Sequence, residues 1–107
     1  MAGDGELLQQ YSRSGLDASF AELVRRHLDF VFSTAVRVAN GDEDLAKDVS
    51  RDVFIDLARK ASALSTRRSL TGWFYASACF AAAWLAATIS KAVQGIRKRI
   101  ALANSSF

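Results

Sequence analysis

The sequence predicts an all-α protein, a compact bundle of about four helices. Its 107 residues include six glycines and no proline, a composition that favours helices over a sandwich with many turns. Half of the residues are hydrophobic, which suffices for the modest core of one small domain. In two long segments the apolar residues recur at the i, i+3 and i+4 positions of one helix face. We therefore expect a single helical domain over residues 1–107.

The first two helices are delimited by residues that commonly start or stop a helix. Asp4 is positioned to cap a short helix over residues 5–12, and Gly15 ends or follows that helix. A second helix begins near residues 17–19, where Ser19 and Glu22 fit the capping-box pattern. It ends at Asn40-Gly41 and carries a long apolar stripe: Phe20, Leu23, Val24, Leu28, Val31, Ala35 and Val38. The only histidine, His27, lies at the edge of this stripe, which indicates a packed or boundary residue rather than a catalytic base.

A third helix follows the cap residue Asp42, and one of its faces is unusual. Its core face comprises Leu45, Ala46, Val49, Val53, Leu57 and Ala61. The opposite face carries Asp44, Asp48, Arg51, Asp52, Asp56 and Arg59, with Ile55 among the charges. The four aspartates stand at i+4 spacing, where like charges repel. One interpretation is a solvated face with a single exposed apolar residue, which is normal. The other is a docking face that attracts a basic partner helix and uses Ile55 as its anchor.

The chain then changes from a basic loop to a long uncharged segment. Residues Ser62–Ser69 read as a polar loop, with Leu64 folded back onto the core. A fourth helix begins near Ser69, and residues 69–90 contain no charged side chain. That segment either packs among the other helices or spans a membrane over Leu70 to Ile89, for which it is long enough. Its many Ala, Ser and Thr residues give a weak drive for membrane insertion. The remaining residues either extend this helix or fold back as another.

Charge and motifs restrict the chemistry. The net charge of +3 permits a polyanionic partner without demanding one. One cysteine excludes an internal disulfide and favours a cytoplasmic location. The acidic start, with Asp4 and Glu6, differs from a secretory signal. There is no phosphate-binding glycine motif, no Cys/His metal spacing and no second acidic cluster for magnesium. We therefore predict a protein that is not an enzyme and that needs neither a cofactor nor a metal.

Three segments carry a resemblance to a known family: DEDLAKDVSRDVFIDLARK (42–60), SLTGWFYASACFAAA (69–83) and FAELVRRHLDFVFSTAVRV (20–38). Together they resemble region 2 of the sigma-70 family, closest to the extracytoplasmic-function (ECF) sigma factors of bacteria, and the resemblance covers about residues 5–83. From Trp84 onward the chain departs from the family, whose helix there is richer in basic and polar residues. The second domain of the family, a helix-turn-helix that binds the −35 element, has no counterpart. We therefore expect weak binding to duplex promoter DNA.

The resemblance implies two binding surfaces for transcription initiation. The third helix would dock on the coiled coil of the largest subunit of core RNA polymerase, through Asp48, Arg51, Asp52, Ile55, Asp56 and Arg59. Arg51-Asp52 falls where the family commonly has Gln-Glu, so one contact is chemically changed. The melted non-template strand of the promoter −10 element would be held by base stacking and Arg–phosphate contacts, through Ser65, Thr66, Arg67, Arg68, Ser69, Trp73 and Tyr75. An anti-sigma factor is a further partner that the resemblance admits.

Other interpretations of the same residues remain open at this point. Arg67 and Arg68 could merely solubilise a turn, and Trp73 could pack in the core. The chain as a whole could be a protein–protein interaction module with no role on DNA. It could also be a small membrane-anchored helical protein that uses the uncharged segment.

Overall fold

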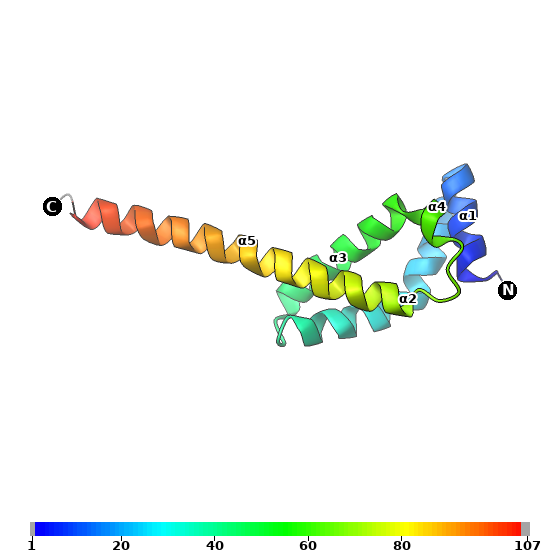
Figure 1. Cartoon of the computed structure of the whole chain (residues 1–107), viewed down its shortest axis with the longest axis horizontal. Coiled ribbons are helices and arrows are strands. Elements are labelled where there is room, and N and C mark those ends of the chain that lie inside the picture. Colours follow the sequence, from blue (N-terminus) through cyan, green and yellow to red (C-terminus); the bar gives the residue numbers. More distant parts are fainter. Residues whose placement is uncertain (1, 106–107) are drawn as a thin grey trace.

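The computed structural model describes residues 2–105, and every regular element in that range is an α-helix. The elements are α1 (Asp4–Ser14), α2 (Asp17–Val38), α3 (Glu43–Arg59), α4 (Ala61–Leu64) and α5 (Thr71–Ser105) (Figure 1). The predicted all-α class is therefore confirmed. Met1, Ser106 and Phe107, which belong to the predicted domain, lie outside the described residues.

The helices do not form the compact bundle that we expected, because α5 runs far beyond the other elements (Figure 1). The chain measures 68 × 26 × 19 Å and has a radius of gyration of 18.2 Å, whereas a compact domain of this length has about 13 Å. Leu85 is the last α5 residue that packs against the core. The residues after Trp84 thus extend α5 instead of folding back, since no proline interrupts the helix.

The core lies between α2, α3 and the first half of α5, and α1 and α4 cover one end of it. Phe74 is its largest fully buried side chain. The Phe74 ring lies 5.0 Å from the His27 ring, 5.6 Å from the Trp73 ring and 5.9 Å from the Phe54 ring, measured between centroids. One residue of α5 therefore joins the three long helices. The predicted boundary position of His27 is confirmed, because its ring packs on this core.

The predicted start of α3 is confirmed, whereas the predicted caps of α1 and α2 are wrong. The Asp42 carboxylate accepts a hydrogen bond of 3.1 Å from the Leu45 backbone N–H. Asp4 instead lies inside the first turn of α1, and its carboxylate contacts α2. Ser19 lies inside α2, and its hydroxyl donates to Gln10 Oε1 at 2.8 Å. Both side chains make bonds between α1 and α2, which local sequence patterns do not reveal.

The helix ends agree with the sequence prediction, whereas the loop over residues 62–69 and the exposure of Leu28 differ from it. Gly15 and Asn40 adopt the left-handed backbone expected of helix ends, with φ of 62° and 54°. The predicted loop over residues 62–69 is partly helical, because α4 occupies Ala61–Leu64 and buries Leu64 as predicted. Leu28 was predicted to face the core but is 45% exposed, because it lies at the edge of the α2 stripe.

Candidate functional site

The outer face of α3 displays Ile55 among charged side chains, as the helical periodicity predicts. Ile55 is 43% exposed, while Val53 and Leu57 on the other face are buried. Asp48, Arg51 and Arg59 are exposed, and Asp52 and Asp56 are half-buried. The predicted orientation of the helix is therefore confirmed.

A groove of about 690 Å³ runs between this face of α3 and the first half of α5. One wall carries Asp52, Val53, Ile55, Asp56, Arg59 and Lys60. The other wall carries Trp73, Ala76, Ser77, Phe80, Ala81 and Trp84. Four of the six predicted polymerase-binding residues thus line one concave surface. Asp48 and Arg51 lie outside it, farther toward the start of α3.

The groove combines an apolar interior with charged groups that have no partner among the described residues. Phe80 and Trp84 are 78% and 59% exposed. A cluster of exposed aromatic side chains of this size usually marks a binding surface. Within residues 2–105, Asp52, Asp56 and Arg59 make no ion pair or side-chain hydrogen bond. These side chains can therefore pair with an incoming partner without first breaking internal contacts.

Trp73 and Tyr75, which were both predicted to contact DNA, do not lie on one surface beside the basic loop. Trp73 is half-buried and lines the groove. Tyr75 is 51% exposed and is not part of the groove. Two residues along a helix are about 200° apart around its axis, so the two rings point to different sides. Trp73 therefore belongs with Ile55 rather than with the loop.

The sequence interpretation missed the α5 wall, since it treated residues 69–90 as one uncharged segment. The signal was nevertheless present, because Trp73, Phe80 and Trp84 are spaced i, i+7 and i+11 and share one helix face. Phe74 and Ala78, about 100–140° around the axis from Trp73, are buried. Because the core-facing positions are a different set of residues, the three aromatic positions form a separate stripe that points away from the core.

The predicted DNA-binding loop now comprises residues 65–70, between α4 and α5. The Ser65 hydroxyl donates to the Ser62 carbonyl at 2.6 Å, and the Thr66 hydroxyl donates to the Ala63 carbonyl at 3.4 Å. The Ser69 hydroxyl accepts from the Thr71 N–H at 3.3 Å. Arg67 and Arg68 are exposed and have no ion pair within the described part of the chain. The hydroxyls therefore shape the turn, while the two guanidinium groups face solvent.

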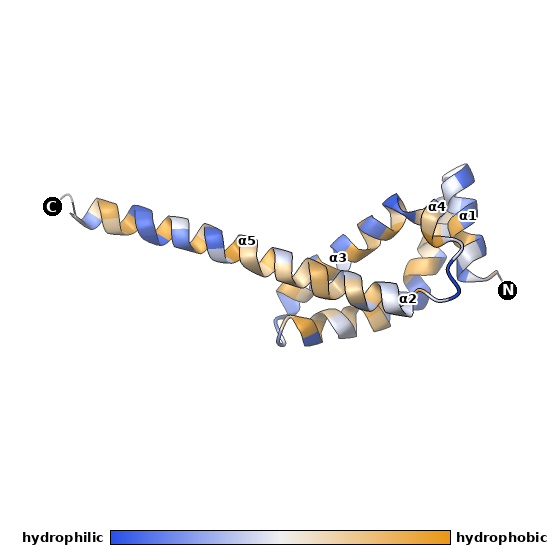
Figure 2. Ribbon diagram, in the orientation of Figure 1, coloured by the Kyte–Doolittle hydropathy of each residue, from blue (hydrophilic) through white to orange (hydrophobic). Residues whose placement is uncertain are grey.

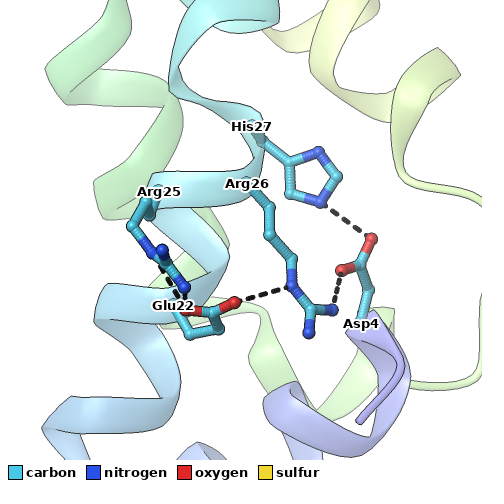
Figure 3. A network of polar contacts seen from close by, with 5 residues as sticks. All are labelled: Asp4, Glu22, Arg25, Arg26 and His27. Carbon is cyan, nitrogen blue, oxygen red and sulfur yellow. Dashed lines mark hydrogen bonds and ion pairs between the residues drawn. The ribbon is translucent and has the colours of Figure 1, made fainter. Parts of the chain in front are cut away.

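A separate polar network holds α1 against α2 (Figure 3). Arg26 bridges Glu22 and Asp4, with its Nε 3.1 Å from Glu22 Oε1 and its Nη1 3.3 Å from Asp4 Oδ1. His27 Nε2 donates to Asp4 Oδ2 at 2.8 Å, and Arg25 donates to Glu22. Every member of the network is bonded to another member, and the contacts of Asp4 tie the start of α1 to α2.

This network predicts a pH dependence of stability. Hydrogen bonds from Arg25 and then Arg26 hold the pKa of Glu22 below its ordinary value of 4.5. A carboxyl with a lowered folded-state pKa stabilises the fold above its unfolded pKa and loses that contribution as the pH falls through the folded one. Glu22→Gln should therefore be less stable than wild type at neutral pH, and the difference should close below about pH 4.5.

Urea unfolding followed by circular dichroism across this pH range measures that difference. Glu6→Gln is the matched control, because Glu6 is exposed in the first turn of α1 and has no ion pair among residues 2–105. A difference between wild type and Glu22→Gln that stays constant with pH would contradict the prediction.

Two further properties of the described residues bear on function. No three His, Cys, Asp or Glu side chains among residues 2–105 are placed to hold a metal ion. Over Thr71–Asn104, α5 is long and apolar enough to cross a membrane, and only 11% of its most apolar window is buried. Core helices of soluble proteins can meet the same length and composition, although they are mostly buried.

The groove between α3 and α5 is the main structural guide to function. No protein-family model, no curated protein and no solved structure matches the chain.

Proposed function

We propose that the protein is a helical binding module of the sigma region 2 type, which docks on core RNA polymerase in transcription initiation. The observation that carries this proposal is the exposed Ile55 in a groove with an aromatic wall and unpaired charges. An apolar side chain that becomes buried when the partner binds, surrounded by polar groups, is the usual form of a protein–protein hot spot. The resemblance of α2, α3 and the start of α5 to sigma region 2 supplies the identity of the partner.

The shape of the groove favours a helical partner. Its walls are two helices, so it is elongated and matches the helix-in-groove mode of recognition. Ile55 and Phe80 would contact the apolar side of the partner. Asp52 and Asp56 would pair with basic side chains, which contributes to the association rate and to specificity. A helix of the polymerase coiled coil has this general form.

The basic loop supports a second contact, with the melted −10 strand. Arg67 and Arg68 lie in the loop just before α5, and the exposed ring of Tyr75 follows at the fifth residue of that helix. Arginines that bind phosphates and a ring that stacks on a base are the elements of single-strand recognition. Trp73 contributes to polymerase docking in this proposal, because it lines the groove. The loop leads directly into α5, and α5 forms one wall of the groove. The two proposed contacts are therefore adjacent.

Replacing both Arg67 and Arg68 by Ala should weaken binding to single-stranded DNA. Each lost phosphate contact flattens the salt dependence by about 0.7 units on single strands, so the double variant should lose up to about 1.4 units. Fluorescence anisotropy with a labelled non-template −10 oligonucleotide and core polymerase, over a salt series, measures the slope. Arg37→Ala with Lys47→Ala changes the charge equally at exposed sites elsewhere. An unchanged slope in the loop variant would exclude the loop from the DNA site and favour an interaction module without a DNA role.

A membrane anchor is the alternative that a specific observation favours, because α5 meets the length and composition of a spanning helix. The two proposals differ in a simple property. A polymerase-binding module stays in solution without detergent and is retained by immobilised core polymerase. A protein that requires detergent and partitions with membranes would overturn the sigma proposal.

A further inference from the structure

The part of α5 beyond the bundle carries an uncovered apolar stripe. Ile89, Val93, Ile96 and Ile100 are 51%, 41%, 55% and 55% exposed. At 100° per residue, these side chains and Leu85 lie within an arc of about 80°. Small, polar and basic residues separate them along the helix, and apolar and polar colours alternate along the protruding segment (Figure 2). We call these five residues the α5 stripe; its first member, Leu85, is half-buried at the edge of the core.

The stripe is a continuation of the face by which α5 enters the core. Phe74, Ala78 and Ala82 are buried against the bundle, and the same helical spacing places them in line with Leu85 and Ile89. Because α2 and α3 pack on this side of α5, a flat surface that approached the stripe would first meet the bundle. The stripe is therefore shaped for a rod that fits between the protruding helix and the end of the bundle, not for a flat lipid surface.

We propose that the rod is the same segment of a second copy of the chain, paired antiparallel about a two-fold axis. The spacing of the stripe is self-complementary. When the midpoint lies between residues 92 and 93, Leu85 faces Ile100 of the other copy, Ile89 faces Ile96, and Val93 lies beside the axis. A two-fold interface requires that residue i contacts j while j contacts i, and this register satisfies that condition for every member.

Charge selects the antiparallel arrangement. Residues 86–105 contain Lys91, Arg97, Lys98 and Arg99 and no acidic residue. A parallel pair would place the two Arg97–Arg99 clusters side by side, where they repel. The antiparallel register places each cluster opposite the uncharged residues Ala86–Thr88 of the other copy.

The same register brings each basic cluster to an acidic part of the other copy. Phe54 of α3 contacts Phe74 of α5, and the two helices run in opposite directions (Figure 1). Glu43 lies as many residues before Phe54 in α3 as Leu85 lies after Phe74 in α5, so Glu43 and Leu85 are at about the same level along the two helices. The exposed residues Asp42, Glu43 and Asp44 at the start of α3 therefore lie within about one helical turn, measured along the α5 axis, of the level of the Arg97–Arg99 cluster of the other copy. The pairing thus joins apolar to apolar and basic to acidic surfaces.

The oligomeric state of the full chain tests this proposal. Sedimentation over a concentration series should show a dimer for wild type and a monomer for Val93→Lys, which places two like charges beside the axis. Gln94→Lys is the matched control, because it adds the same charge at the next position, on the polar side of the helix, and should remain dimeric. Circular dichroism establishes that both variants are folded. A wild-type chain that stays monomeric throughout overturns the proposal.

Cysteine cross-linking in a Cys79→Ser background tests the direction of pairing. Val93→Cys should link to itself through a short thiol-reactive reagent. Ile89→Cys should not link to itself but should link to Ile96→Cys when the two variants are mixed. Self-linkage of Ile89→Cys would indicate a parallel pair and overturn the proposed register. A monomeric chain that co-sediments with vesicles of anionic phospholipid would show that lipid covers the stripe, and this result would overturn the proposal as well.

Discussion

Ile55→Glu should leave the protein folded and weaken its binding to core RNA polymerase by about 2 kcal/mol or more, roughly thirtyfold in Kd. Ile55 is 43% exposed, so a polar replacement should change the free energy of unfolding by no more than about 0.5 kcal/mol. In the complex the same position would be desolvated beside the half-buried Asp52 and Asp56. A third carboxylate there would lose the apolar contact and repel its neighbours.

Leu28→Glu is the matched control for this variant. Leu28 is 45% exposed, the chemical change is identical, and the residue lies on α2, away from the groove. Thermal melting and a titration with core polymerase measure the two effects separately. If Ile55→Glu melts far below wild type, the side chain is part of the core. If both variants bind polymerase as tightly as wild type, the groove is not the docking site.

Phe74→Ala should lower the free energy of unfolding by about 3–5 kcal/mol, the largest effect that we expect from any single substitution in this chain. Phe74 is 1% exposed, and its ring contacts His27, Phe54 and Trp73. Its removal leaves a cavity where α2, α3 and α5 meet, and small domains have only about 5–15 kcal/mol of total stability. Much of the native population should therefore be lost on mild heating.

Phe80→Ala makes the same chemical change on the same helix and provides the control. Phe80 is 78% exposed in the groove, so its truncation should alter stability by about 0.5 kcal/mol or less while weakening polymerase binding. Urea unfolding with circular dichroism detection compares the two variants directly. Equal loss of stability in both would mean that the start of α5 is not anchored through Phe74.

Helical periodicity by itself determined most of the residues of α2 and α3 that face inward, with Leu28 as the exception. The positions of Val53 and Leu57 in the core and of Ile55 at the surface follow from about 100° of rotation per residue. The cap at Asp42 was equally predictable, because the Leu45 N–H that donates to its carboxylate is only three residues away in the sequence. Features that depend only on near neighbours within one helix could therefore be predicted from the sequence.

The tertiary structure alone decided the contacts between segments that are distant in the sequence. Asp4 and Ser19 have the side chains of helix caps, yet each is used to join α1 to α2. Trp73 joins Ile55 in one groove only because α5 packs along α3. The course of α5 beyond Leu85 depends on whether any part of the chain returns to cover its stripe. A local pattern fixes the face of a helix but not the helix that packs against it, since that choice depends on the packing of the whole chain.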